Sequence, residues 1–310
     1  GFFQAMPFIF FGLFGGVLAD TLNRKRLIYI THSLNVLPGL ALGILTVTGA
    51  VQVWHVNVLS VLAGAPQVLG GPARQAIIPS LVPQSHLLNA VTMTSLMMQS
   101  TQLTAPVIAG FLIDFYGVAA SYFTDAALLL PSVASVLLIR ASGQPQGQRR
   151  QIGWRSLIEG FEFLWHTRII LSLFILDFFA VLFGFYRPIL PIFADTIYGV
   201  GARGLGMLYA APAIGAMIGS ALVLSAGHIE RQGALSIIAT LAFALSLGFL
   251  GFAPWFWMGL IALGCLGISD ATSVAIRRTV VQVLAPDDMR RRATSFLTLF
   301  AQATNGFGPG

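Results

Sequence analysis

Long apolar stretches, separated by short polar connections, run along the whole chain. Each stretch has about 20 residues, the length that a helix needs to cross a hydrocarbon core ~30 Å thick. Apolar and polar positions do not alternate within them, so they do not resemble the strands of a membrane β-barrel. The pattern predicts ten membrane-spanning helices, over residues 2–19, 27–48, 53–73, 91–112, 118–139, 169–190, 205–225, 233–253, 255–276 and a tenth from 293.

Composition supports a membrane protein and excludes other classes. Of the 310 residues, 56% are hydrophobic and 9% are charged, whereas roughly 25% of a soluble domain is charged. The single cysteine, Cys265, excludes a disulfide framework and a cysteine metal site. The five histidines are scattered, mostly in or near connections, so we interpret them as interfacial residues rather than as metal ligands or a proton relay. Both ends lie inside apolar stretches, so we expect a fragment of a longer protein.

Basic residues predict the orientation. Of the 17 lysines and arginines, 15 lie on alternate connections, and only Arg187 and Arg203 remain for the other side. Lys and Arg collect on the cytoplasmic side of membrane proteins. The net charge of +6 therefore reflects topology rather than a nucleic-acid partner. The connections predicted to be cytoplasmic are 20–26, 74–90, 140–168, 226–232 and 277–292.

The longest connection divides the chain into an N-terminal bundle (1–140), a linker (141–168) and a C-terminal bundle (169–310). The linker begins with a polar run, 143–148, that is rich in helix breakers. Apolar residues then recur at helical spacing, which predicts an amphipathic helix on the cytoplasmic membrane surface. A partner-binding helix is the alternative. The apolar residues are Trp154, Leu157, Ile158, Phe161 and Leu164.

The two bundles repeat at a constant offset of 203 residues, as from Arg74 to Arg277. Both members of each pair fall on the same side of the predicted membrane, so the repeats run parallel. Parallel repeats suit a transporter with a central path between its halves. The other pairs are Gly12 with Gly215, Gly16 with Gly219, Pro83 with Pro286, Ala90 with Ala293, and Pro106 with Pro309.

Residues 16–26 resemble a loop signature of the major facilitator superfamily, Gly-x-Leu-Ala-Asp-Arg-x-Gly-Arg-Lys. Further stretches resemble the drug and siderophore exporter branch: 74–83, 88–90, 159–161 and 190–193. The chain matches the signature at Gly16, Asp20, Arg24 and Lys25. It differs at Thr21, which replaces an arginine, and at Asn23, which replaces a glycine. A weakened exporter motif of the fifth helix contains Pro106 and Gly110, and Gly308 and Pro309 repeat it.

The resemblance implies an all-α membrane protein with two parallel-related bundles, of which the chain covers about helices two to eleven of twelve. It also implies a monomeric secondary active exporter in a bacterial inner membrane, working by alternating access without a cofactor. In this family Asp20 would face the positive end of the eleventh helix, near Ala293, and latch the two halves. Such a contact contributes ~0.3–1 kcal/mol. An aspartate hydrated at the membrane boundary is the alternative.

Charges inside spans are the other candidate site residues, because each costs at least ~2.5–3.5 kcal/mol at the bilayer centre. Asp177 is the deepest acid, and the aromatic residues around it suit a lipophilic solute, charged or neutral; ordinary phenylalanines of a membrane helix are the alternative. Burial would let Asp177 exchange protons; a structural acid is the alternative. We interpret Asp270 and Arg277 as a structural pair or a headgroup contact. Asp125, Arg74 and Arg187 complete the candidates for coupling or substrate binding.

Two other functions compete with export of a small solute. A membrane enzyme is disfavoured, because the chain lacks the common motifs for nucleophilic, metal-dependent or nucleotide chemistry. We therefore predict no catalytic residues. A lipid or lysolipid flippase on the same fold would tolerate the aromatic content equally well, and the identity of the substrate is left open.

Overall fold

The computed structural model describes residues 21–139, 143–144, 171–172, 175, 184, 186–226 and 232–284. Within these ranges the chain is helical and contains no strand, as the all-α prediction requires. Seven of the described helices are long and apolar enough to cross a membrane. They are α2 (Arg24–Val47), α3 (Val53–Leu81), α4 (Leu87–Tyr116), α5 (Val118–Leu138), α9 (Gly201–Ser225), α10 (Gln232–Gly251) and α11 (Phe256–Leu284).

Two helices extend further than hydropathy predicts. Helices α3 and α11 each continue eight residues past the predicted ends at 73 and 276. The prediction that Arg74 and Arg277 lie in connections was therefore wrong, since both are helical. A helix does not stop where its apolar run stops, and long arginine side chains at a helix end reach the membrane interface.

The repeat holds at the scale of a whole helix. Helix α11 begins and ends 203 residues after α3, because Val53 maps onto Phe256 and Leu81 onto Leu284. Helix α10 likewise corresponds to most of α2. The helix bounds thus repeat at the same offset as the sequence motifs.

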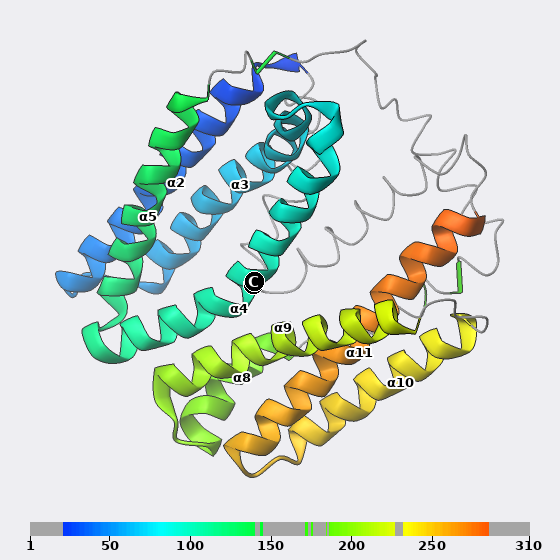
Figure 1. Cartoon of the computed structure of the whole chain (residues 1–310). Coiled ribbons are helices and arrows are strands. Elements are labelled where there is room, and N and C mark those ends of the chain that lie inside the picture. Colours follow the sequence, from blue (N-terminus) through cyan, green and yellow to red (C-terminus); the bar gives the residue numbers. More distant parts are fainter. Residues whose placement is uncertain are drawn as a thin grey trace. The chain divides into compact units, whose positions relative to one another are not determined.

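The chain divides into two compact units. The first comprises Gly1–Met98, Leu112–Arg150 and Asn305–Gly310. In its described part, α2 packs against α3 and α5 (Figure 1). His32 lies inside α2, in agreement with the predicted span over 27–48, and its Nδ1 is 2.8 Å from the Ser132 hydroxyl of α5. The buried core residues are Leu27, Ile28, Ala73, Ile77 and Val136.

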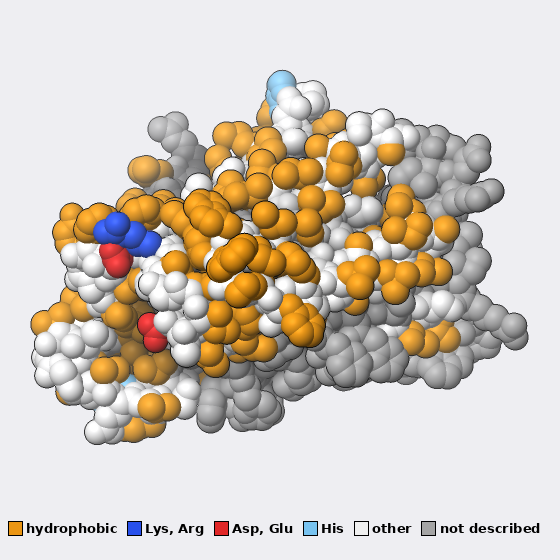
Figure 2. All heavy atoms as spheres, turned by 90° about the horizontal axis from the view of Figure 1, so that it is seen from below, with side chains coloured by type: hydrophobic (Ala, Val, Ile, Leu, Met, Phe, Trp, Pro, Cys, Tyr) orange, Lys and Arg blue, Asp and Glu red, His pale blue; other side chains and the backbone are white. Residues whose placement is uncertain are grey.

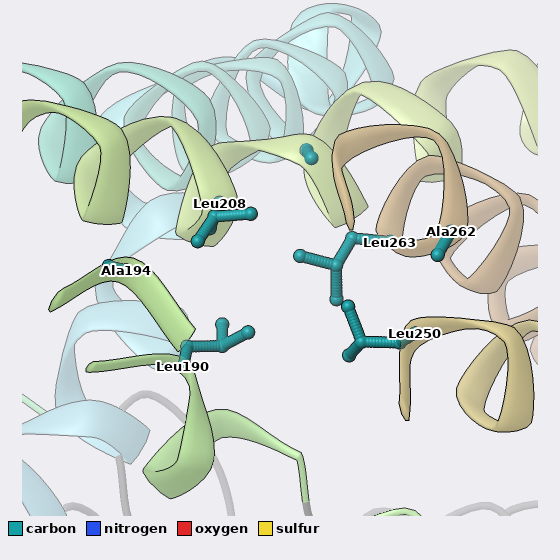
Figure 3. Packing of buried hydrophobic residues seen from close by; sticks show 7 residues of the cluster. Leu190, Ala194, Leu208, Leu250, Ala262 and Leu263 are labelled. Atoms are coloured by element: carbon teal, nitrogen blue, oxygen red, sulfur yellow. The ribbon is translucent and has the colours of Figure 1, made fainter. Parts of the chain in front are cut away.

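The second unit comprises Gln99–Phe111 and Gln151–Thr304, so part of α4 belongs to it. Helix α11 packs against both α9 and α10. Its core joins these three helices to the short helical stretch before α9 (Figure 3). The buried residues are Leu190, Ala194, Leu208, Ala211, Leu250, Ala262 and Leu263.

That short stretch departs from the predicted continuous span over 169–190. It consists of a 3₁₀ turn, η2 (Arg187–Ile189), one α turn, α8 (Leu190–Ile192), and a π turn, η3 (Phe193–Ile197). Pro188 and Pro191 carry no backbone N–H, so neither can donate to a regular α-helical ladder. The helical path is therefore irregular, and it ends seven residues later than predicted.

Apolar side chains cover most of the described surface in Figure 2, with charged groups at only a few places. Many large hydrophobic residues along the helices are exposed, including Leu37, Leu128 and Leu245. Apolar patches of this extent mark a surface that contacts lipid or another protein. The helices therefore present the apolar exterior that a bilayer requires.

Candidate functional site

A polar cluster forms within the second unit from Tyr186, Arg187, Tyr209 and Asp270. The positive charge of Arg187 acts on the hydroxyl of Tyr186, its neighbour in the chain. The hydroxyl of Tyr209 donates to the backbone oxygen of Arg187 at 3.1 Å. The charge of Asp270 acts on Tyr186. Three separate helical segments thus supply one group of polar side chains.

The polar cluster lies deep along its helices. Tyr209 is eight residues into α9 and Asp270 is fourteen residues into α11, or ~12 Å and ~21 Å along helices that rise 1.5 Å per residue. A hydrocarbon core is ~30 Å thick. Arg187 and Asp270 are nevertheless exposed, while both tyrosines are half-buried. Charges at such depth usually serve a solute or ion path.

The polar cluster contains two of the predicted candidates, Arg187 and Asp270. Tyr209 was missed, because one tyrosine in an apolar helix carries no sequence signal for its partner. Asp125 and Arg74 belong to the first unit and are not members of the cluster. Asp125 is exposed on α5, and a Cβ placed on Gly39 of α2 would be 3.5 Å from its Oδ2 atom.

Two signature residues form a second polar site, the loop-signature junction, in the first unit. The guanidinium of Arg24 donates to the backbone oxygen of Ala76 in α3 at 2.8 Å. The ammonium of Lys25 donates to the backbone oxygens of Leu137 at 3.1 Å and Ile139 at 2.6 Å. The last carbonyls of a helix lack intrahelical donors, and a cation is favourable there. Lys25 therefore caps the end of α5.

Asn23 and Gly143 complete the junction. Asn23 replaces the signature glycine and caps α2, since its side-chain oxygen accepts from the backbone N–H of Arg26 at 3.1 Å. The backbone N–H of Arg24 donates to the oxygen of Gly143 at 2.8 Å. Gly143 has φ = 61°, and a Cβ there would be 2.6 Å from the Asn23 oxygen. Sequence reasoning identified Gly143 only as a helix breaker.

The exporter motif of α4 lies at a close helix crossing. A Cβ on Gly110 would be 2.6 Å from the oxygen of Ala202 and 3.2 Å from Cα of Gly206, both in α9. A Cβ on Gly206 would collide with the oxygen of Pro106. Small residues let helix backbones approach in a membrane, so the two helices touch through their main chains. Gly206 was not predicted.

An apolar pocket of about 400 Å³ lies beside this crossing, between α4, α9 and α11. No charged residue lines it, so it suits hydrocarbon rather than a polar group. Its lining residues are Leu103, Val107, Met207, Ala210, Ala211, Ile214, Trp257, Leu260, Ile261 and Gly264.

A half-buried tyrosine, Tyr198, connects the turn before α9 to the turn before α11 in the second unit. The hydroxyl of Tyr198 donates to the backbone oxygen of Ala253 at 3.1 Å. Burial raises the pKa of Tyr198 above its usual value, because desolvation disfavours the phenolate. The hydroxyl consequently remains a donor at neutral pH.

Several predicted features lie outside the described residues. They are Gly16, Asp20, Asp177, Gly308, Pro309, the amphipathic helix over 154–164 and the spans over 2–19 and from 293. In the described ranges, no three residues of the types His, Cys, Asp or Glu are grouped so as to hold a metal ion.

Comparison with known proteins identifies the family. A family model described as transmembrane secretion effector matches residues 3–307. The enterobactin exporter EntS of Shigella dysenteriae serotype 1 (strain Sd197) is 28% identical over 291 residues, covering 94% of this chain and 70% of the relative. EntS of Escherichia coli O81 (strain ED1a) is 29% identical with the same coverage.

Solved structures agree on the fold. A bacterial homologue of the human lysosomal transporter Spinster, inward-facing and unoccupied, matches with a TM-score of 0.75 and 17% identity, over 100% of this chain and 72% of the other. The nucleoside transporter NupG (D323A mutant) matches with a TM-score of 0.72 and 15% identity, over 99% and 78%. The fold of two parallel-related bundles is thereby confirmed.

The matched relatives are transporters rather than enzymes. They confirm the resemblance that the loop signature and exporter motifs indicated, and with it a multi-pass protein of a bacterial inner membrane. The chain belongs to the transmembrane secretion effector family of the major facilitator superfamily.

Proposed function

We propose that this protein exports small lipophilic solutes by alternating access and that the proton gradient drives the export. The observation that carries the proposal is the polar cluster, which brings Arg187 of η2 to Tyr209 of α9 and places Asp270 fourteen residues into the apolar helix α11. Each such charge costs at least ~2.5–3.5 kcal/mol in a bilayer. A solute path accounts for that cost. The outward direction is supported by the relatives named enterobactin exporters.

The loop-signature junction supports alternating access. Arg24 and Lys25 bind backbone oxygens of α3 and α5, so their donors act within the first unit rather than on a solute. They join three helices at one end, which favours motion of the unit as a rigid body, as rocking of one repeat against the other requires. Asp20, four residues before Arg24, stays our candidate for the latch between the two halves, a contact that would break and re-form in each transport cycle.

Asp177 remains the leading candidate for the coupling acid, with Asp270 as the described alternative. The test is transport of ethidium, a lipophilic cation, by the full-length protein in liposomes with an imposed pH gradient. We expect Asp177→Asn to lower gradient-driven transport at least tenfold and to flatten its pH dependence, because the amide cannot titrate. Asp270→Asn is measured in parallel.

Asp195→Asn is the matched control, since Asp195 is an exposed aspartate in η3. It should transport like the wild type. If the pH gradient leaves wild-type transport unchanged, proton coupling is wrong. If Asp177→Asn matches the wild type in rate and pH dependence, the coupling acid lies elsewhere.

The apolar pocket supports a second candidate function, lipid translocation. Its volume of about 400 Å³ and apolar lining suit part of an acyl chain. A fluorescent lysophospholipid assay in the same liposomes separates the two functions. A rate of lysophospholipid transfer that rises with the amount of protein in the liposomes, without ethidium transport, would favour a flippase.

A further inference from the structure

We propose that Gln99 of α4 binds the polar group of an uncharged amphipathic solute, whose apolar part occupies the adjacent apolar pocket. The inference rests on the proposed export function and names its substrate class. The substrates would include lipophilic molecules that carry a hydroxyl or amide group and no net charge. The candidates drawn from the sequence for substrate binding were all charged residues, so this assignment comes from the structure.

The position of Gln99 along α4 is the first step. Helix α4 has 30 residues, from Leu87 to Tyr116, and is ~45 Å long at a rise of 1.5 Å per residue. A hydrocarbon core ~30 Å thick takes up about 20 of these residues. Every stretch of that length within α4 contains residues 97–106. Gln99 therefore lies at the depth of the hydrocarbon core, whichever part of α4 crosses it.

The surroundings of the Gln99 amide are the second step. Its side chain is exposed, and among the described residues none is hydrogen-bonded to the amide. An amide without a hydrogen-bonding partner is costly in hydrocarbon, which disfavours contact of Gln99 with lipid chains. Polar residues inside membrane helices usually face the interior of a bundle or a water-filled cavity. The amide thus offers N–H donors and a carbonyl acceptor to a solute.

The face of α4 that carries Gln99 is the third step. Gln99 precedes Pro106 by seven residues, about two turns of helix, so both lie on one face. At Pro106 and Gly110 this face touches the main chain of α9, because a Cβ on Gly206 would collide with the Pro106 oxygen. Gln99 is exposed. The face is therefore closed by α9 at the crossing and open about two turns away from it.

The apolar pocket begins one turn from Gln99. Leu103 and Val107, four and eight residues after Gln99 in α4, line it together with Gly264 of α11. Its volume is about 400 Å³, and no charged residue contributes to its lining. A ligand with its apolar part in the pocket could place a polar group at Gln99, ~6 Å along the helix from Leu103. A neutral polar group fits best, because the pocket supplies no counter-charge.

The test is equilibrium binding to the full-length protein in lipid nanodiscs at pH 7, with empty nanodiscs as the blank. Two radiolabelled probes share one apolar body: 4-octylphenol carries a hydroxyl group and octylbenzene does not. We expect Gln99→Leu to weaken binding of 4-octylphenol about fivefold or more, because one hydrogen bond is lost, and to change binding of octylbenzene less than twofold. Gln99→Asn keeps the amide on a shorter side chain and should fall between.

Gly264→Leu tests the pocket, since a Cβ at Gly264 meets nothing within 4 Å and a larger side chain can fill the space. It should weaken binding of both probes about fivefold or more. Gly248→Leu in α10 is its control, because a Cβ there also meets nothing within 4 Å. Thr104→Val is the control for Gln99: it lies ~140° round α4, and the Thr104 hydroxyl donates to the Ser100 oxygen at 2.8 Å. Both controls should bind like the wild type.

Several results would overturn the proposal: equal losses for the two probes in Gln99→Leu, wild-type binding in Gln99→Leu or Gly264→Leu, or no saturable binding by the wild type. Melting temperatures separate a structural role, since an amide bonded to another helix would lower the melting temperature of Gln99→Leu without weakening binding of 4-octylphenol. Binding is measured without a gradient. Retained binding with no proton-driven export would therefore refute the export mechanism alone, and export without this binding would refute the substrate class alone.

Discussion

At the scale of single residues, hydrogen bonds to backbone oxygens explain the loop signature. Arg24 donates to a backbone oxygen of α3, near a proline that interrupts the helical hydrogen bonds, and Lys25 donates to backbone oxygens at the end of α5, which lack helical donors. Pro79 lacks the N–H that would donate to the oxygen of Gln75, so the α3 ladder is interrupted next to the Ala76 oxygen that Arg24 binds. Basic residues near such a position therefore serve helix packing as well as topology.

Lys25→Ala should destabilise the first unit, because it leaves the end of α5 without its cap. We expect a loss of about 1 kcal/mol, seen as a lower melting temperature of the purified protein. Arg26→Ala is the control, since Arg26 is exposed and lies next to Lys25. Equal melting temperatures for the two variants would show that charge alone, rather than the cap, matters.

At the scale of elements, glycine sets how closely helices approach. The α4–α9 crossing depends on Gly110 and Gly206, and the α9–α11 crossing on Gly215, Gly219 and Gly267, whose added Cβ atoms would all meet backbone. In a membrane, packing rather than hydrophobic burial joins helices. Main-chain contact is thus the means by which the second unit holds α4, α9 and α11 together.

Gly206→Ala should destabilise the α4–α9 crossing, because the new methyl group collides with the Pro106 oxygen. A loss of about 1–3 kcal/mol is expected from overpacking, with slower transport. Gly248→Ala is the control, since nothing lies within 4 Å of its added Cβ in α10. Alanine there should be neutral or stabilising by up to ~1 kcal/mol. The same response from both variants would contradict the crossing.

At the scale of the whole molecule, the bounds of the helices repeat along the chain. The match of α3 with α11 at an offset of 203 residues is direct evidence. The glycines of α9 that contact α11, Gly215 and Gly219, correspond to Gly12 and to Gly16, the first residue of the loop signature. Duplication thus explains why small residues recur at the same register in both halves.

Labelling of single cysteines tests the predicted topology, in a Cys265→Ala background because Cys265 is exposed. Gln148→Cys and Arg291→Cys lie in segments predicted to be cytoplasmic. Neither should react with a membrane-impermeant maleimide added to intact cells, and both should react after lysis. Pro254→Cys, in the exposed turn before α11, should react in intact cells. The opposite pattern would invert the orientation.

The sequence by itself determined the membrane class, the spans, the repeat and the family resemblance. These features are local or periodic: the length of an apolar run matches the thickness of the bilayer, and a motif is a short run of adjacent residues. It placed the ends of α3 and α11 eight residues early, because hydropathy falls before helical hydrogen bonding does.

Only the tertiary structure decided which residues meet. The oxygens that Lys25 binds lie 112 and 114 residues away, and Gly206 lies 96 residues from its partner Gly110. Tyr209 joins Arg187 although it stands alone in an apolar helix. Such contacts depend on how helices cross, and the crossing is set by packing over many residues at once, which no single stretch of sequence records.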